Sequence, residues 1–185
     1  MILIILDRDG TIIKRREFLG KNDNWREEIE LNEDLIECLK IIDTKYKSKK
    51  IVITNQAGVA RNLFSEDRVK EINEYIHNSL KKTNIHIDDW EYCPYVDRKY
   101  AESSKLEFNE DYVSEKTKRK PSTFMVFDAL NKLNLSLKDF DKIIVFGDRE
   151  EDDELAKNLN TKFIDVKNKT KENLIKKFTE FVKKN

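Results

Sequence analysis

Short apolar runs recur along the chain, and each is followed by polar residues. The first run covers residues 1–6, and similar runs lie at residues 51–53, 90–93, 143–146 and 161–166. Continuous apolar runs of this length are typical of strands that are buried on both faces. The sequence therefore predicts five short strands, the first at the N-terminus.

Apolar residues spaced three or four apart between these runs predict amphipathic helices. One stripe covers residues 31–46 and another covers 69–80, where Ser65 can cap the first turn. A third helix is expected to begin at Pro121, because proline is tolerated in a first turn. A closing helix over residues 174–182 is expected to dock its apolar face on the core.

Strands that alternate with helices indicate the α/β class, with a parallel sheet covered on both faces in a three-layer, Rossmann-like fold. The length of 185 residues fits a single domain spanning residues 1–185. Residues 95–118 are polar and lack a clear period, which predicts a loop insertion. Long loops in compact domains are often functional.

The charges are balanced, with 36 Lys and Arg against 36 Asp and Glu. This balance disfavours a nucleic-acid partner, and 38% hydrophobic residues argue against disorder. Cys38 and Cys93 are too few for a disulfide framework, so reduced thiols are expected. The apolar N-terminus meets Asp7 too soon for a signal peptide or membrane span. We expect a soluble, cytoplasmic protein with no membrane partner.

The residues after the first predicted strand carry the strongest chemical signal. Asp7 and Asp9 are separated by one residue and followed by a glycine. Ligands of open α/β sheets bind beyond the carboxyl ends of the strands. One carboxylate and a backbone carbonyl there can share a cation, while the second carboxylate is free to transfer protons.

Polar residues at other strand and helix ends complete the candidate site. Residues 54–61 combine a hydroxyl, backbone amides and a glycine after a strand, as in a phosphate cradle. Lys120 precedes a predicted helix and can neutralise a phosphoryl oxygen. Asp148 follows a strand directly and is a candidate metal ligand. Asp152 and Asp153 fit equally well as dipole partners of a helix start or as functional acids.

These sites, in this order, resemble the four motifs of the haloacid dehalogenase (HAD) superfamily of phosphohydrolases. The match runs from residue 2 to about 156, through LDRDGTI, TNQAGVAR, YCP and RKP. It is most similar to the subfamily III branch that contains heptose bisphosphate phosphatase and histidinol phosphate phosphatase. The resemblance implies a HAD-like fold with no large cap domain, and Mg²⁺ as the cofactor.

The resemblance also implies a role for each motif residue. Asp7 would be the nucleophile and Asp9 the general acid and base, while Thr54 and Lys120 would hold the phosphoryl oxygens. Mg²⁺ would bind Asp7, the backbone carbonyl of Asp9, and Asp148. The residues expected to contact the substrate are Asn55, Gln56, Arg61 and Arg119.

One segment departs from the family's zinc-binding loop. Cys93 matches the first zinc ligand, but Tyr95, Lys116 and Lys118 stand at the other three positions. One ligand out of four cannot hold zinc, so no zinc is expected.

Five single residues complete the sequence predictions. Phe124 replaces a glycine after RKP and is expected to narrow the pocket entrance, and Arg149 stands where the heptose enzymes carry lysine. Trp25 fits either the core or a flap over the site. His77 and His86 lack partner spacing and are expected at the surface.

The predicted function is Mg²⁺-dependent hydrolysis of a small phosphomonoester, such as a sugar phosphate, through an aspartyl-phosphate intermediate. Heptose bisphosphate is expected to be a poorer substrate than some smaller phosphomonoester. A polynucleotide 3′-phosphatase, which shares the DxDGT, TNQ and RKP signatures, is the alternative enzyme. A receiver module phosphorylated on aspartate is the alternative from another class, although its aspartate follows a central strand rather than the first one. A monomer or small homo-oligomer is expected.

Overall fold

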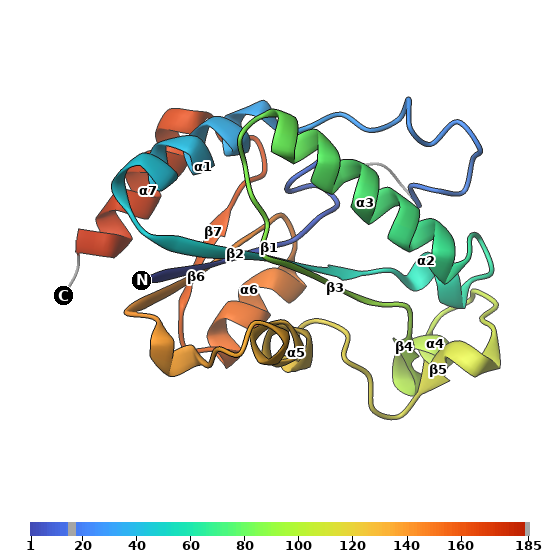
Figure 1. The fold of residues 1–185 in the computed structure, drawn as a ribbon. Coiled ribbons are helices and arrows are strands. Elements are labelled where there is room, and N and C mark those ends of the chain that lie inside the picture. The colour runs from blue at the N-terminus through green and yellow to red at the C-terminus, as the bar shows by residue number, and fades with distance from the viewer. Residues whose placement is uncertain (15–17, 184–185) are drawn as a thin grey trace.

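The computed structural model describes residues 1–14 and 18–183 and contains a five-stranded parallel sheet (Figure 1). The strands are β1 (Ile2–Leu6), β2 (Ser48–Asn55), β3 (Asp89–Cys93), β6 (Lys142–Gly147) and β7 (Lys162–Asp165). Their order across the sheet is β3-β2-β1-β6-β7. The five predicted strands and the α/β class are confirmed.

Helices cover both faces of this sheet, which gives the three layers visible in Figure 1. One face carries α1 (Glu33–Lys45), α3 (Glu66–Lys82) and α7 (Lys171–Lys183). The other carries α5 (Phe124–Lys132) and α6 (Glu150–Asn158). The short α2 (Ala57–Ala60) follows β2, and a 3-10 helix, η2 (Leu137–Asp139), precedes β6. Ser65 caps α3 as predicted, because its hydroxyl accepts a hydrogen bond from the backbone N–H of Arg68 at 3.2 Å.

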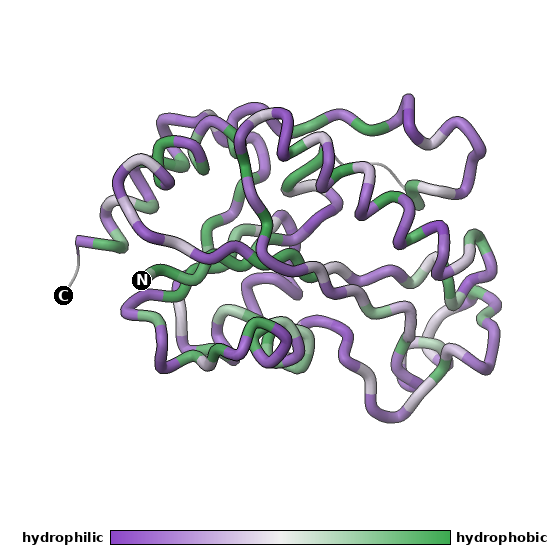
Figure 2. Tube along the Cα trace, viewed as in Figure 1, coloured by the Kyte–Doolittle hydropathy of each residue, from purple (hydrophilic) through white to green (hydrophobic). Residues whose placement is uncertain are grey.

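Strand β1 shows why the sequence reads as continuous apolar runs. Ile2, Ile4 and Leu6 pack on the side of α1, α3 and α7, whereas Leu3 and Ile5 pack on the side of α5 and α6. Both faces of a covered parallel sheet are dry, so there is no polar side to alternate with. Figure 2 shows the hydrophobic residues gathered in the central strands and the hydrophilic ones on the loops and outer helix surfaces.

Residues 95–118 form a small insertion beyond the C-terminal end of β3 (Figure 1). It contains a parallel two-stranded ladder of β4 (Val96–Asp97) and β5 (Val113–Ser114), the helix α4 (Arg98–Ser103) and a 3-10 helix, η1 (Glu110–Tyr112). Val96, Val113 and Ala60 form a small apolar cluster of their own. Elements this short are below the length at which a hydrophobic period is visible in sequence.

The predicted start of the third helix is wrong by three residues. Residues 119–122 form a turn in which Ser122 donates a backbone hydrogen bond to the Arg119 carbonyl at 2.9 Å. The Lys120–Pro121 peptide bond within this turn is cis. The Ser122 hydroxyl accepts from the backbone N–H of Phe124, and α5 begins at Phe124.

Trp25 and His77 are more deeply buried than expected from the sequence. Trp25 is 1% exposed and packs edge-on against Tyr75, so it belongs to the core and not to a flap. His77 was expected at the surface, but it is half-buried because Trp90 on β3 lies against it and donates its indole N–H to Nδ1 at 3.1 Å. His86 is exposed as predicted. Within the described residues, no helix is long and apolar enough to cross a membrane.

Candidate active site

The C-terminal edge of the sheet brings a buried lysine between two aspartates. Asp7 directly follows β1, and Asp152 lies in the first turn of α6. The Nζ atom of Lys120 is 2.5 Å from Oδ1 of Asp7 and 2.6 Å from Oδ1 of Asp152. All three side chains are buried, so solvent screens these charges little and each ion depends on the others.

The backbone of Lys120 is held in place by Asn55 at the end of β2. Asn55 accepts from the Lys120 backbone N–H through Oδ1 at 2.8 Å, and its Nδ2 donates to the Lys120 carbonyl at 3.3 Å. Asn55 was expected to contact substrate, and it lines the cleft described below. Its amide is nevertheless engaged at both ends in positioning the lysine.

Three carboxylates converge beside this lysine. Asp7, Asp148 and Asp152 each offer an oxygen, and these oxygens lie within 4.8 Å of one another. Both oxygens of Asp152 already have partners, because its Oδ2 accepts from the backbone N–H groups of Asp148 and Arg149, each at 3.2 Å, and its Oδ1 accepts from Lys120. Asp7 and Asp148 are therefore the better pair for a metal ion.

Two glycines make room for these carboxylates. Gly10 has a φ of +90°, which strains other residues, and a Cβ there would lie 2.4 Å from Oδ2 of Asp148. A Cβ on Gly147 would lie 2.3 Å from Oδ2 of Asp152. The backbone therefore approaches both acids more closely than any side chain would allow.

Asp9 points to a different set of partners. Its carboxylate accepts from Nε and Nη2 of Arg8 at 3.0 and 2.9 Å, and from Nε2 of Gln56 at 2.7 Å. Gln56 also lies 2.8 Å from Oγ1 of Thr54 and donates to it, which leaves the hydroxyl proton of Thr54 for another acceptor. Gln56, expected as a substrate contact, thus links the proposed acid to the proposed phosphoryl ligand.

The charge of Asp7 is poorly compensated. Burial raises its pKa to about 7; Lys120 opposes the rise, while the negative charges of Asp152 and Asp9 add to it. Burial lowers the pKa of Lys120, but Asp7 and Asp152 outweigh this and raise it above its ordinary value. The lysine thus stays charged but is shared, so a second cation beside Asp7 would favour its carboxylate form.

A cleft of about 180 Å³ opens next to Asp9. It combines aromatic walls with two guanidinium groups, and its lining includes Phe18, Phe64, Tyr100, Arg119 and Arg149. Tyr100 comes from α4 of the insertion, and the Cζ atom of Arg119 lies 5.6 Å from the centre of its ring. The insertion therefore contributes directly to the wall of the candidate substrate site.

Two expected cleft residues lie elsewhere. Arg61 does not line the cleft, but its guanidinium stacks over Phe18, which does, at 4.4 Å from the ring centre. Phe124 is 61% exposed and also lies outside the lining, because α5 turns this first residue toward solvent. Phe124 therefore does not narrow this cleft as predicted, whereas Tyr100 contributes to its wall.

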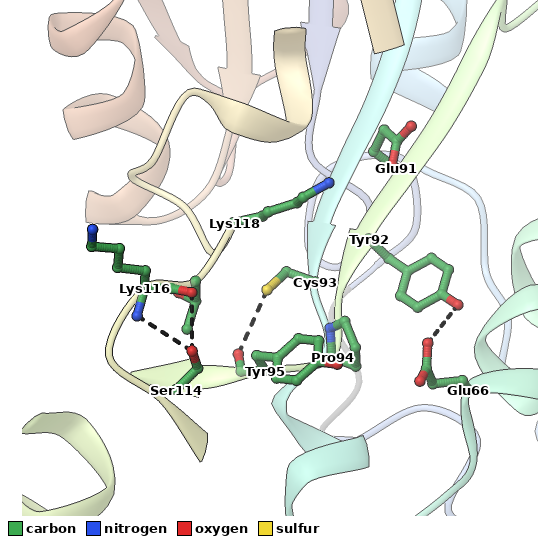
Figure 3. A pocket seen from close by; sticks show the side chains of 10 residues that line it. Glu66, Glu91, Tyr92, Cys93, Pro94, Tyr95, Ser114, Lys116 and Lys118 are labelled. Atoms are coloured by element: carbon green, nitrogen blue, oxygen red, sulfur yellow. Dashed lines mark hydrogen bonds between the residues drawn. The ribbon is translucent and has the colours of Figure 1, made fainter. Parts of the chain in front are cut away.

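A separate cavity of about 540 Å³ lies where the family's zinc loop would be (Figure 3). The Cys93 thiol donates to the carbonyl of Tyr95 at 3.7 Å, and burial raises the pKa of this thiol. Lys116 and Lys118 line the same cavity as cations rather than metal ligands. Cys93 is the one cysteine in the lining of this cavity and the lining contains no histidine, so these residues do not fit a structural zinc site built from four cysteine and histidine ligands.

Asp152 is the member of the carboxylate cluster whose role the sequence left undecided. Asp153, its neighbour, lies outside the cluster and pairs with Lys157 at 2.6 Å, one helical turn away. The sequence did contain an indication of this position for Asp152. An acid at the third position of a helix can accept hydrogen bonds from the backbone N–H groups that precede the helix, and α6 begins shortly after Gly147.

The fold and this carboxylate–lysine cluster are typical of α/β proteins that bind phosphoryl groups. No family model matches the chain. It is 31% identical over 147 residues to D-glycero-alpha-D-manno-heptose-1,7-bisphosphate 7-phosphatase of Photorhabdus laumondii subsp. laumondii, covering 80% of this chain and 72% of that protein. It is 30% identical over 149 residues to the beta-heptose enzyme of Haemophilus influenzae, with the same coverage. The chain therefore belongs to the heptose bisphosphate phosphatase family of the HAD superfamily, and it is a phosphatase.

Solved structures support the same fold. D,D-heptose 1,7-bisphosphate phosphatase from B. bronchiseptica, complexed with magnesium and phosphate, matches with a TM-score of 0.67 at 21% identity, covering 96% of this chain and 87% of that one. Strand β1 is both first in the chain and central in the sheet, so strand position does not separate this protein from a receiver module. The similarity to phosphatases distinguishes it from a receiver module.

A pair of neighbouring substitutions tests the role of Asp152. Asp152→Asn should lower kcat/KM by about 100-fold, because a charged partner of Lys120 is lost from a desolvated site. Asp153→Asn removes an exposed charge one residue away and should stay within about twofold of wild type. Steady-state phosphatase assays of both variants measure these effects. Equal losses in the two variants would show that Asp152 has no specific role in activity.

The raised pKa of Asp7 predicts how stability depends on pH when divalent cations are absent. Between about pH 4 and 7, folded Asp7 keeps a proton that the unfolded chain releases, so raising the pH through this window lowers the free energy of unfolding. Asp7→Asn should lack this contribution. Urea unfolding of both proteins in EDTA across pH 4–8 measures the free energy of unfolding at each pH. The same pH dependence for wild type and Asp7→Asn would contradict this prediction.

Proposed function

We propose that this phosphatase hydrolyses a small sugar phosphate or related phosphomonoester, with Mg²⁺ as cofactor and Asp7 as the nucleophile. The observation that carries the proposal is the buried Lys120 beside Asp7, at the edge where β1, β2 and β6 end. A carboxylate held against an ammonium is well placed to attack a phosphoryl group whose oxygens the same ammonium binds.

The residues present fit a magnesium ion. Asp7, Asp148 and the backbone carbonyl of Asp9 would hold it, since Mg²⁺ prefers oxygen ligands and commonly uses one or two carboxylates. When bound, the ion offsets the negative charge of the phosphoryl oxygens. The poorly compensated charge of Asp7 supports a cation at this position.

The chain's own residues account for the two steps of hydrolysis. In the first, an oxygen of Asp7 bonds to phosphorus while the bond to the leaving oxygen breaks, and Asp9 gives that oxygen a proton. In the second, Asp9 takes a proton from the water that attacks phosphorus, and the bond to Asp7 breaks. Lys120 and the Thr54 hydroxyl bind the phosphoryl oxygens throughout.

The cleft supports a compact leaving group. Its aromatic walls suit the C–H face of a sugar or a small ring, and its two arginines suit a second anionic group. The small cleft and the even charge balance keep a polynucleotide as the less favoured substrate. A cytoplasmic location and a monomer or small homo-oligomer stay predictions.

Substitution of the two acids tests the mechanism. Asp7→Asn should abolish turnover, because an amide is neither a nucleophile here nor an anionic ligand. Asp9→Asn should also stop turnover but can accumulate phosphoenzyme, since the second step needs its base. Intact-mass spectrometry after mixing with substrate detects the added phosphoryl group.

Metal analysis provides the accompanying control. EDTA should stop wild-type activity and Mg²⁺ should restore it, with no stoichiometric zinc in the purified protein. Full activity of Asp7→Asn, or one tightly bound zinc per chain, would contradict this account.

Substrate choice should depend on the insertion. Tyr100→Ala should change relative kcat/KM values across a panel of sugar phosphates, amino-alcohol phosphates and heptose bisphosphate, because it removes one wall of the cleft. Leu106→Ala, an exposed position of the same insertion, is the matched control. Heptose bisphosphate should be poorer than a smaller phosphomonoester; a wide margin in its favour, or uniform scaling by Tyr100→Ala, would refute this specificity.

A further inference from the structure

Arg8 is a fully buried charge in the turn between the two proposed catalytic acids. Its carbonyl closes that turn by accepting from the backbone N–H groups of Ile12 and Ile13, each at 3.1 Å. Its side chain is 0% exposed and grips both oxygens of Asp9 through Nε and Nη2. A two-point pairing between a guanidinium and a carboxylate fixes the relative plane of both groups.

The remaining end of this guanidinium is held by helix α3. Nη1 of Arg8 donates to Oδ1 of Asn73 at 2.8 Å, and Asn73 itself is only 7% exposed. Asn73 interrupts the buried apolar stripe of α3, beside Ile72 and one turn before Ile76. A buried amide costs free energy unless its hydrogen bonds are made, so the contact with Arg8 explains a polar residue here.

We propose that Asn73 is a positioning residue for hydrolysis, acting through Arg8 on Asp9. This inference rests on the proposed role of Asp9 as the general acid. Asn73 anchors one end of the Arg8 guanidinium. The other end of the guanidinium, together with Gln56 at 2.7 Å, sets the orientation of the Asp9 carboxylate at the cleft. Without Asn73, Nη1 loses its buried partner, and the fork that holds Asp9 is free to rotate.

The leaving group shows whether Asp9 is misplaced. An alkoxide is a strong base and needs a proton as the P–O bond breaks, whereas p-nitrophenolate is stable enough to leave without one. A shifted Asp9 therefore slows alkyl phosphates far more than p-nitrophenyl phosphate. Damage to Asp7, Lys120 or the metal site slows both classes together, because those groups act on the phosphoryl group itself.

The experiment compares benzyl phosphate with p-nitrophenyl phosphate, which are similar in size but differ in leaving-group basicity. Asn73→Leu and Asn73→Ser should lower kcat/KM for benzyl phosphate by about 100-fold and for p-nitrophenyl phosphate by less than about threefold. Asn73→Ser covers the case in which leucine prevents folding, because serine keeps a small polar side chain at this position but its hydroxyl is one atom shorter than the amide and does not reach Nη1 of Arg8. Asn73→Asp keeps an oxygen acceptor and should restore the wild-type ratio.

The matched control is Asn78→Leu, an exposed asparagine of the same helix, which should leave both substrates unchanged. Urea unfolding of each variant confirms that the protein is folded in the assay. Equal losses on both substrates, or no loss for Asn73→Ser, would overturn the positioning role. If the wild-type enzyme with Mg²⁺ hydrolyses neither these two compounds nor any member of the phosphate panel above, the proposed function fails instead.

Discussion

The structure depends on one buried contact, in which the Lys120 ammonium lies between Asp7 and Asp152. A lysine this deep is tolerated only with charged partners, and each partner comes from a different part of the chain. Strand β1 delivers Asp7, α6 delivers Asp152, and Asn55 fixes the lysine backbone from β2. The parallel sheet brings these segments to one edge, so the packing that forms the fold also assembles the site.

The sheet and the position of the first acidic motif could be predicted from the sequence. Residues 1–6 form a strand because nothing in them can face water, and the acids that end the run must then lie at the edge of the sheet. Ser65 was identifiable as a cap because its hydroxyl precedes a clear apolar stripe. Asp7 and Asp148 could be predicted as candidate site residues because each directly follows a buried strand.

The features that were missed depend on contacts between distant segments. The Asn73–Arg8 contact joins residues 65 positions apart, and no local pattern distinguishes Asn73 from an ordinary polar interruption. The burial of Asp152 follows from the space above Gly147, which only the folded backbone defines. Phe124 was expected near the pocket because it replaces a glycine of the related enzymes, but as the first residue of α5 it faces solvent, and Tyr100 contributes to the wall of the cleft instead.

Lys120 leaves Asp7 short of positive charge, and we propose that a divalent cation fills this deficit. The most direct measurement is anomalous diffraction from crystals of the wild-type protein soaked with Mn²⁺ as a stand-in for Mg²⁺. We expect one peak bounded by Asp7, Asp148 and the Asp9 carbonyl, with Lys120 still between Asp7 and Asp152. A peak confined to the Cys93 cavity, or none at a Mn²⁺ concentration that supports activity, would contradict it.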